Sequence, residues 1–145
     1  QRLRGCNSAL VFGATIGIEI DRLISKYGRI SPSKALFFQA IGAERIESLC
    51  DVFCHDISYT LKTEGLHLLP RFSPGYGDFP LDFQKDIFRA LDCYRKIGLS
   101  LNESMLMSPS KSVTAIAGIS HNPRKNTDKK CSICTKTDCF FRSNK

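Results

Sequence analysis

The stretch SPSKALFFQAIGAERIESLCDVFCHDISYTLKTEG, residues 31–65, predicts the longest element of the chain. Ser31 is a favourable helix N-cap, and Pro32 suits the first helical position, where its missing N–H costs nothing. Apolar residues then recur in steps of three and four, the spacing of one helix face: Ile46, Leu49, Phe53, Ile57 and Leu61. Gly65 ends the pattern. We expect about 30 helical residues, roughly 45 Å in length at ~1.5 Å per residue, with Gly42 as a potential break or kink.

A second set of residues on this helix forms a polar stripe beside the apolar face: Glu47, Asp51, Cys54 and Ser58. Such a stripe is usually a solvated helix face, which is the default interpretation here. Cys50, Cys54 and Cys93 lie in segments with apolar periodicity, so we interpret them as small core residues.

Shorter elements are expected on either side of the long helix. Residues 9–14 are an apolar run of strand length, and Thr15 is a candidate N-cap for a helix that ends at Gly28. Downstream, residues 80–91 have the spacing of a second amphipathic helix, and Gly98 ends that helix or the turn after it.

Two further strands are predicted near the end of the folded region. Residues 104–107 and 113–119 have strand character, and Pro-Ser-Lys at 109–111 is turn chemistry, so the pair predicts a β-hairpin. The expected fold class is therefore α+β: a small, mostly antiparallel twisted sheet that carries this hairpin, with the long helix packed against it.

Between the two larger helices, the sequence RFSPGYGD at 71–78 excludes both a helix and an inner strand. Pro74 has no backbone N–H and disfavours helical geometry at Ser73, and two glycines bracket the aromatic residue. We expect an irregular loop that holds Arg71 and Tyr76 close together, with bare glycine backbone beside them. From composition alone, an ordinary Pro-Gly turn is the simpler interpretation.

Length and composition are those of one ordinary globular domain. The chain has 145 residues, 42% hydrophobic and 24% charged, and a chain of this length buries roughly 70% of its unfolded surface. No apolar run approaches the ~18 residues of a membrane span, and the N-terminus lacks a secretory apolar core, so a cytoplasmic protein without a membrane partner is expected. The chain begins with Gln1 rather than Met, which indicates a fragment truncated at its N-terminus.

Positive charge is concentrated at the C-terminus, which divides the chain into residues 1–120 and a tail, 121–145. The tail contains seven of the 21 basic and two of the 14 acidic residues, a net charge of +5 that leaves +2 for the rest. A solvated basic tail is commoner than a nucleic-acid-binding one, so nucleic acid is not the expected partner.

The tail also contains three closely spaced cysteines, Cys131, Cys134 and Cys139. Two thiols separated by two residues can hold one metal ion, and the third lies within reach after a short turn, so zinc or an iron–sulfur cluster is a candidate cofactor. The fourth ligand would be His121, another residue or an exogenous group, unless a cluster keeps one open iron. The alternative is three free thiols, since a chain of seven cysteines without a signal peptide is expected to be reduced.

Two sequence stretches resemble one known family. RFSPGY at 71–76 resembles the Arg-Pro-Ala-Pro-Gly-Tyr loop of the S-adenosylmethionine-binding activation domain of cobalamin-dependent methionine synthase. GLSLNES at 98–104, followed by Met107, Pro109 and Ser-Val at 112–113, resembles the same family's Leu-Thr-Glu-Ser, Met-x-Pro and Ser-Val stretch. The matches occur in the family's order and at similar separation, and the resemblance covers roughly residues 33–121.

The resemblance implies a stand-alone reactivation domain. In this family the domain holds S-adenosylmethionine over an oxidised cobalamin while one electron arrives from a redox protein, and cobalt is remethylated. The implied partners are a corrinoid-binding protein or methionine synthase, and an electron-donor protein. The chain has no cobalamin- or homocysteine-binding segment, so it is expected to be an accessory domain rather than a complete methyltransferase.

The resemblance also implies the ligand-binding residues. Arg71 would bind the ligand carboxylate bidentately, the backbone of Ser73 and Gly75 would bond the ligand's polar edge, and Tyr76 would offer a flat face to corrin or adenine. By alignment, Glu47 would balance the positive sulfonium and amino groups; an exact shift of the alignment places Ser48 there instead.

The chain departs from the family pattern at both ends. The family's other ligand-binding acid lies in an N-terminal region that this chain lacks, and Ser-His-Asn-Pro at 120–123 leads into the cysteine tail rather than into further structure. Two other hypotheses therefore stay open: a small metal- or iron–sulfur-carrying electron-transfer module acting on a corrinoid protein, and a nucleic-acid binder that uses its tail.

Overall fold

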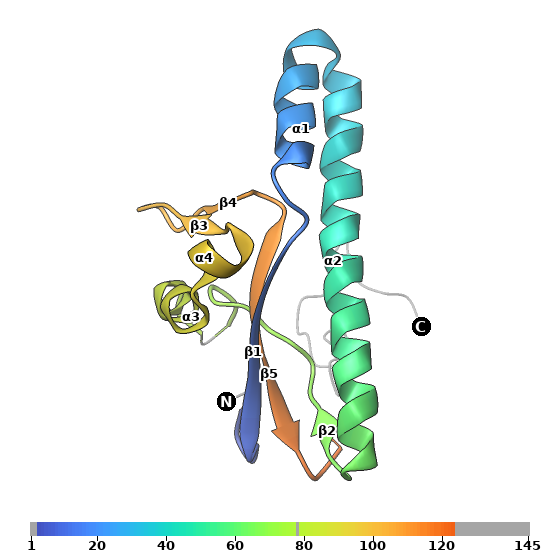
Figure 1. The fold of residues 1–145 in the computed structure, drawn as a ribbon, viewed down its shortest axis with the longest axis vertical. Helices are drawn as coiled ribbons and strands as arrows, with labels where there is room; N and C mark the ends of the chain where they lie inside the picture. The colour runs from blue at the N-terminus through green and yellow to red at the C-terminus, as the bar shows by residue number, and fades with distance from the viewer. Residues whose placement is uncertain (1–2, 78, 124–145) are drawn as a thin grey trace, which may run out of the picture.

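The computed structural model describes residues 3–77 and 79–123, and its longest element is helix α2, Pro32–Thr63 (Figure 1). The predicted helix is confirmed: Ser31 occupies the N-cap position with an extended backbone, and Pro32 is the first helical residue. The helix passes through Gly42 without a break. A Cβ atom on Gly42 would lie 3.0 Å from side-chain atoms of Ile20 and Lys111, so the glycine serves close packing rather than a kink.

A three-stranded antiparallel sheet lies beside α2. Strand β5 (Ser112–Ser120) is central, with β1 (Ser8–Thr15) along one edge and the short β2 (His67–Leu68) along the other. The register pairs Thr15 with Ser112 and Ser8 with Ile119, so β1 and β5 match along the whole of β1.

The molecule has three layers, with the sheet between α2 and a pair of short helices, α3 (Phe83–Leu91) and α4 (Cys93–Ile97) (Figure 1). The core on the α2 side is formed by Phe12, Ile46, Cys50 and Ala115. Cys50 and Cys93 are buried, as predicted, and Cys54 is half-buried at the margin of that core. The expected α+β class with a small antiparallel sheet is confirmed.

Helix α1 (Glu19–Ile30) packs against the N-terminal half of α2, and together they extend beyond the sheet (Figure 1). The prediction that Thr15 caps this helix is wrong, since the helix begins at Glu19 with Ile18 in the N-cap position, and Gly17 before it has φ +84°. The Thr15 hydroxyl accepts the Gly17 N–H at 3.1 Å in the turn that precedes the helix. The predicted end at Gly28 is also wrong. One glycine is tolerated inside a helix, and the Tyr27 ring packs on Phe38 of α2, 5.3 Å away.

The predicted hairpin between residues 104–107 and 113–119 is wrong. β4 (Met107–Ser108) pairs instead with β3 (Ser100–Leu101) as a separate two-stranded ribbon, while β5 pairs with β1 and β2. The turn in that ribbon is closed by Asn102, whose N–H and side-chain oxygen both bond Leu106. The turn residues at 109–111 do not determine the pairing of β5, because β1 is a much longer partner strand. The β1–β5 pair also forms one side of the core.

Two glycine substitutions test this packing with opposite signs. Gly118→Ala in β5 should lower the free energy of unfolding by about 1–2 kcal/mol, because its Cβ would lie 2.5 Å from Cys6 Sγ and 3.3 Å from Leu69 Cδ1. Gly28→Ala in α1 meets nothing within 4 Å and should raise stability by roughly 0.5–1 kcal/mol through helix propensity. Urea unfolding measures both. Equal stability of the two variants would contradict the packing of Cys6 on β5.

Candidate functional site

The loop that follows β2 is fixed to the central strand. Leu69 donates its N–H to the Gly118 carbonyl at 2.8 Å, and Phe72 and Ile116 exchange two backbone hydrogen bonds at 2.9 Å. These bonds set the path of the chain across the sheet and place Arg71 beside α2.

The Arg71 guanidinium contacts two carboxylates on consecutive turns of α2. Its Nη2 lies 2.7 Å from Glu47 Oε2, and its Nη1 lies 2.5 Å from Asp51 Oδ1. The Arg71 side chain is 22% exposed, whereas Glu47 and Asp51 are 63% and 69% exposed. Burial alone would lower the pKa of Arg71, but the hydrogen bonds to Asp51 and Glu47 outweigh it and raise the pKa. The site therefore holds a permanent cation whose two acidic partners remain open to solvent.

Two thiols lie beside this ion cluster. Burial raises the pKa of Cys50, which the charge of Arg71 opposes only in part. Burial also raises the pKa of Cys54, against the charge and hydrogen bond of Arg71. Both thiols therefore stay protonated at neutral pH. Within residues 3–77 and 79–123, no group of three or more His, Cys, Asp or Glu side chains is arranged to hold a metal ion.

The polar stripe of α2 is thus more than a solvated face, because two of its members bind Arg71. Of the two alignment registers, Glu47 is the residue that contacts Arg71, while the half-buried Ser48 has no such contact in the described part of the chain. Asp51 was not assigned a binding role from the sequence. The available signal was its position one turn after Glu47 in the same stripe.

The rest of the loop turns tightly after Arg71. Pro74 is buried, and Gly75 has φ +91°, a left-handed conformation that favours glycine. The Gly75 N–H donates to the Phe79 carbonyl at 2.8 Å, so this donor is used inside the loop. Ser73 is half-buried, and Tyr76 is 68% exposed. The loop therefore presents an aromatic ring to solvent on a backbone that its own hydrogen bonds hold in place.

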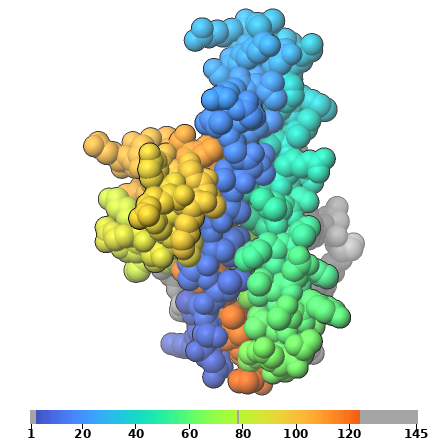
Figure 2. All heavy atoms as spheres, in the orientation of Figure 1, coloured from blue at the N-terminus to red at the C-terminus, as the bar shows by residue number. Residues whose placement is uncertain are grey.

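The opposite layer of the molecule forms a separate lobe (Figure 2). It comprises α3, α4 and the β3–β4 ribbon, and it contains a cavity that the sequence did not predict. No helix in the described ranges has both the length and the apolar character needed to cross a membrane.

The predicted metal ligands Cys131, Cys134 and Cys139 lie outside the described residues, so the metal site stays a prediction. No protein-family model matches the chain, and a comparison with curated proteins gives no significant match. The geometry around Arg71 and the two sequence motifs are therefore the features that point to a function.

Proposed function

We propose that this chain is an S-adenosylmethionine-binding domain that supports reductive remethylation of the cobalamin of a methionine synthase or related corrinoid methyltransferase. The observation that carries the proposal is the 2.7 Å contact between Arg71 and Glu47. These residues come from a loop and a helix 24 positions apart, and they are the two side chains that the resemblance assigns to the charged end of the ligand.

The charge of the cluster supports a cationic ligand. Arg71, Glu47 and Asp51 together have one net negative charge, whereas S-adenosylmethionine, with a sulfonium, an ammonium and a carboxylate, has one net positive charge. Opposite charges of this kind favour both encounter and binding. The ligand carboxylate would pair with the planar guanidinium fork in place of one acidic partner, and the freed carboxylate would face the ammonium or sulfonium group.

The neighbouring loop residues suit the rest of the ligand. The exposed ring of Tyr76 is available to stack on adenine or on a corrin face. Ser73 and Gly75 would contribute backbone groups; because the Gly75 N–H is engaged with Phe79, acceptor carbonyls are the more available of these groups.

The chain would act with two partners, a corrinoid-binding protein and an electron-donor protein. S-adenosylmethionine supplies the methyl group when bound, and the donor supplies one electron to cobalt. The role of this chain is to orient the sulfonium methyl group toward a corrinoid held elsewhere. The metal-carrying electron-transfer alternative depends on the tail cysteines, and no contact among the described residues favours it.

A pair of variants on α2 tests the proposed site. Glu47→Gln should weaken S-adenosylmethionine binding about 10-fold or more, since a hydrogen bond to a charged group contributes roughly 1.5–3 kcal/mol. Ser48→Ala should bind within about two-fold of the parent, because a half-buried hydroxyl beside the cluster lacks the needed charge. Isothermal titration calorimetry measures both. If Ser48→Ala weakened binding more than Glu47→Gln, Ser48 and not Glu47 would be the binding residue. Unchanged affinity in both variants would show that α2 does not contribute to the binding site.

A further inference from the structure

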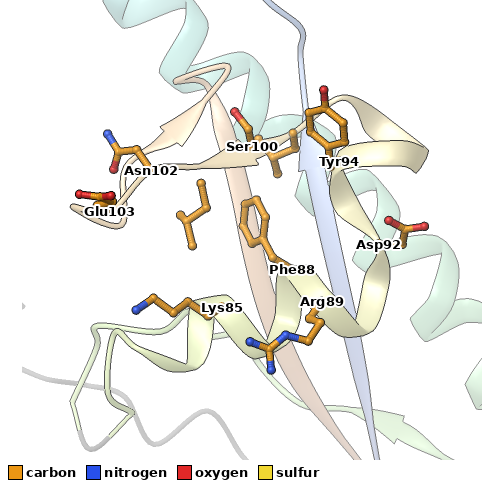
Figure 3. Close-up of a pocket in the computed structure, with 10 residues that line it drawn as sticks. Lys85, Phe88, Arg89, Asp92, Tyr94, Ser100, Asn102 and Glu103 are labelled. Atoms are coloured by element: carbon orange, nitrogen blue, oxygen red, sulfur yellow. The ribbon is translucent and has the colours of Figure 1, made fainter.

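The cavity in the lobe of α3, α4 and the β3–β4 ribbon lies between α3 and that ribbon, on the side of the sheet away from α2 (Figures 1 and 3). Its volume is about 670 Å³, within the range of small-molecule sites. Lys85, Phe88 and Arg89 come from α3, and Asn102 and Glu103 come from the turn after β3.

The floor of the cavity is apolar. Phe88 points into it from α3 (Figure 3), and two leucines also line it, Leu101 and Leu99, the second of which is 0% exposed. The polar groups of the ribbon already have partners: the Ser100 hydroxyl donates to the Ser108 carbonyl at 3.2 Å, and Asn102 Oδ1 accepts the Leu106 N–H at 2.9 Å. The charged side chains, the Tyr94 hydroxyl and the Asn102 side-chain NH2 are therefore the groups that an occupant's polar atoms can contact.

Four charged residues line the cavity, two of each sign. Arg89 pairs with Asp86, and Asp92 pairs with Arg95, each at 3.7 Å. Lys85 and Glu103 form no ion pair within the described part of the chain. They lie on facing walls, at the same end of the cavity and beside the apolar floor (Figure 3).

We propose that this cavity binds an apolar α-amino acid. The ammonium of Lys85 would pair with the ligand carboxylate, the carboxylate of Glu103 would pair with the ligand ammonium, and the apolar side chain would lie on Phe88 and Leu101. A ligand with both charges would engage both walls, whereas a simple anion or a simple cation would engage only one of these two exposed side chains. This binding site is separate from the proposed S-adenosylmethionine site and does not depend on it.

Titration of the ¹⁵N-labelled chain with L-phenylalanine and L-leucine, followed by NMR, tests the proposal. We expect saturable shifts of amides in α3 and in residues 99–103. 3-Phenylpropionate lacks the ammonium, phenethylamine lacks the carboxylate and glycine lacks the side chain, so each should bind at least ~10-fold more weakly. Absence of shifts in the cavity with both amino acids would overturn the proposal, as would equal affinity for 3-phenylpropionate.

Surface variants complete the test without risk to folding. Lys85→Gln and Glu103→Gln should each weaken L-phenylalanine binding about 10-fold, whereas Lys96→Gln, a matched change on α4 outside the cavity, should leave it unchanged. Arg71→Ala should also leave amino-acid binding unchanged, which separates this proposal from the one above. Parent-like affinity in both Lys85→Gln and Glu103→Gln would overturn the assigned charge pairing.

Discussion

Replacing Leu99 with alanine is expected to lower the free energy of unfolding by about 3 kcal/mol. Leu99 is 0% exposed and is among the largest fully buried side chains of the described residues. Its backbone N–H donates to the Cys93 carbonyl at 3.2 Å, so the residue joins α4 to β3. Truncation would leave a void that this rigid junction cannot close, and the midpoint of thermal unfolding should fall by about 10 °C.

The matched control is Leu106→Ala. Leu106 is in the turn of the same ribbon, but it is 65% exposed, so we expect a loss of less than about 1 kcal/mol. Urea unfolding followed by circular dichroism measures both variants. If the two substitutions cost the same, the second lobe does not have its own core around Leu99.

Arg71→Ala is expected to give the largest change in ligand binding. Loss of the guanidinium removes the bidentate partner of the ligand carboxylate and leaves Glu47 and Asp51 without a counter-charge. We expect S-adenosylmethionine to bind about 30- to 100-fold more weakly, or roughly 2–3 kcal/mol. Arg71→Lys should recover only part of this loss, because a point charge lacks the planar fork.

Arg71→Ala should affect folding less than ligand binding, although the largely buried Arg71 side chain also loses packing contacts. Both acidic partners of Arg71 are well exposed, and exposed ion pairs contribute about 0–1 kcal/mol. Arg89→Ala is the control, an 80% exposed arginine on α3 that should leave S-adenosylmethionine binding unchanged. Parent-like binding in both Arg71 variants would contradict the assignment of this loop.

The sequence predicted the elements whose signals are local. For α2, the Ser-Pro start, the apolar spacing and the terminal glycine gave bounds within two residues of the observed helix. The partner of β5 could not be predicted in this way. Pairing of Thr15 with Ser112 joins positions almost 100 residues apart. The turn residues at 109–111 contain no information about a strand so distant in the sequence. The helix start at Glu19 was missed because Thr15 has the chemistry of a cap, but Gly17 adopts φ +84° and the helix begins only after it.

The candidate site was likewise predicted only where its sequence signals are local. The irregular loop around Arg71 follows from Pro74 and the glycines that flank Tyr76, and the family resemblance added Glu47. The role of Asp51 was not predicted, because helical spacing identifies the polar stripe on α2 but not that Arg71 lies opposite it. The cavity beside Lys85 and Glu103 was also missed, since it forms only where α3 packs near the ribbon.

The most direct test of the account is calorimetric titration of the chain with S-adenosylmethionine, beside 5′-methylthioadenosine, which lacks the amino acid end and the sulfonium charge. We predict saturable binding of S-adenosylmethionine at one site, and binding of 5′-methylthioadenosine at least ~10-fold weaker, because Arg71 and Glu47 would contact only the former's charged end. No saturable binding of S-adenosylmethionine, or equal affinity for the two compounds, would contradict the account.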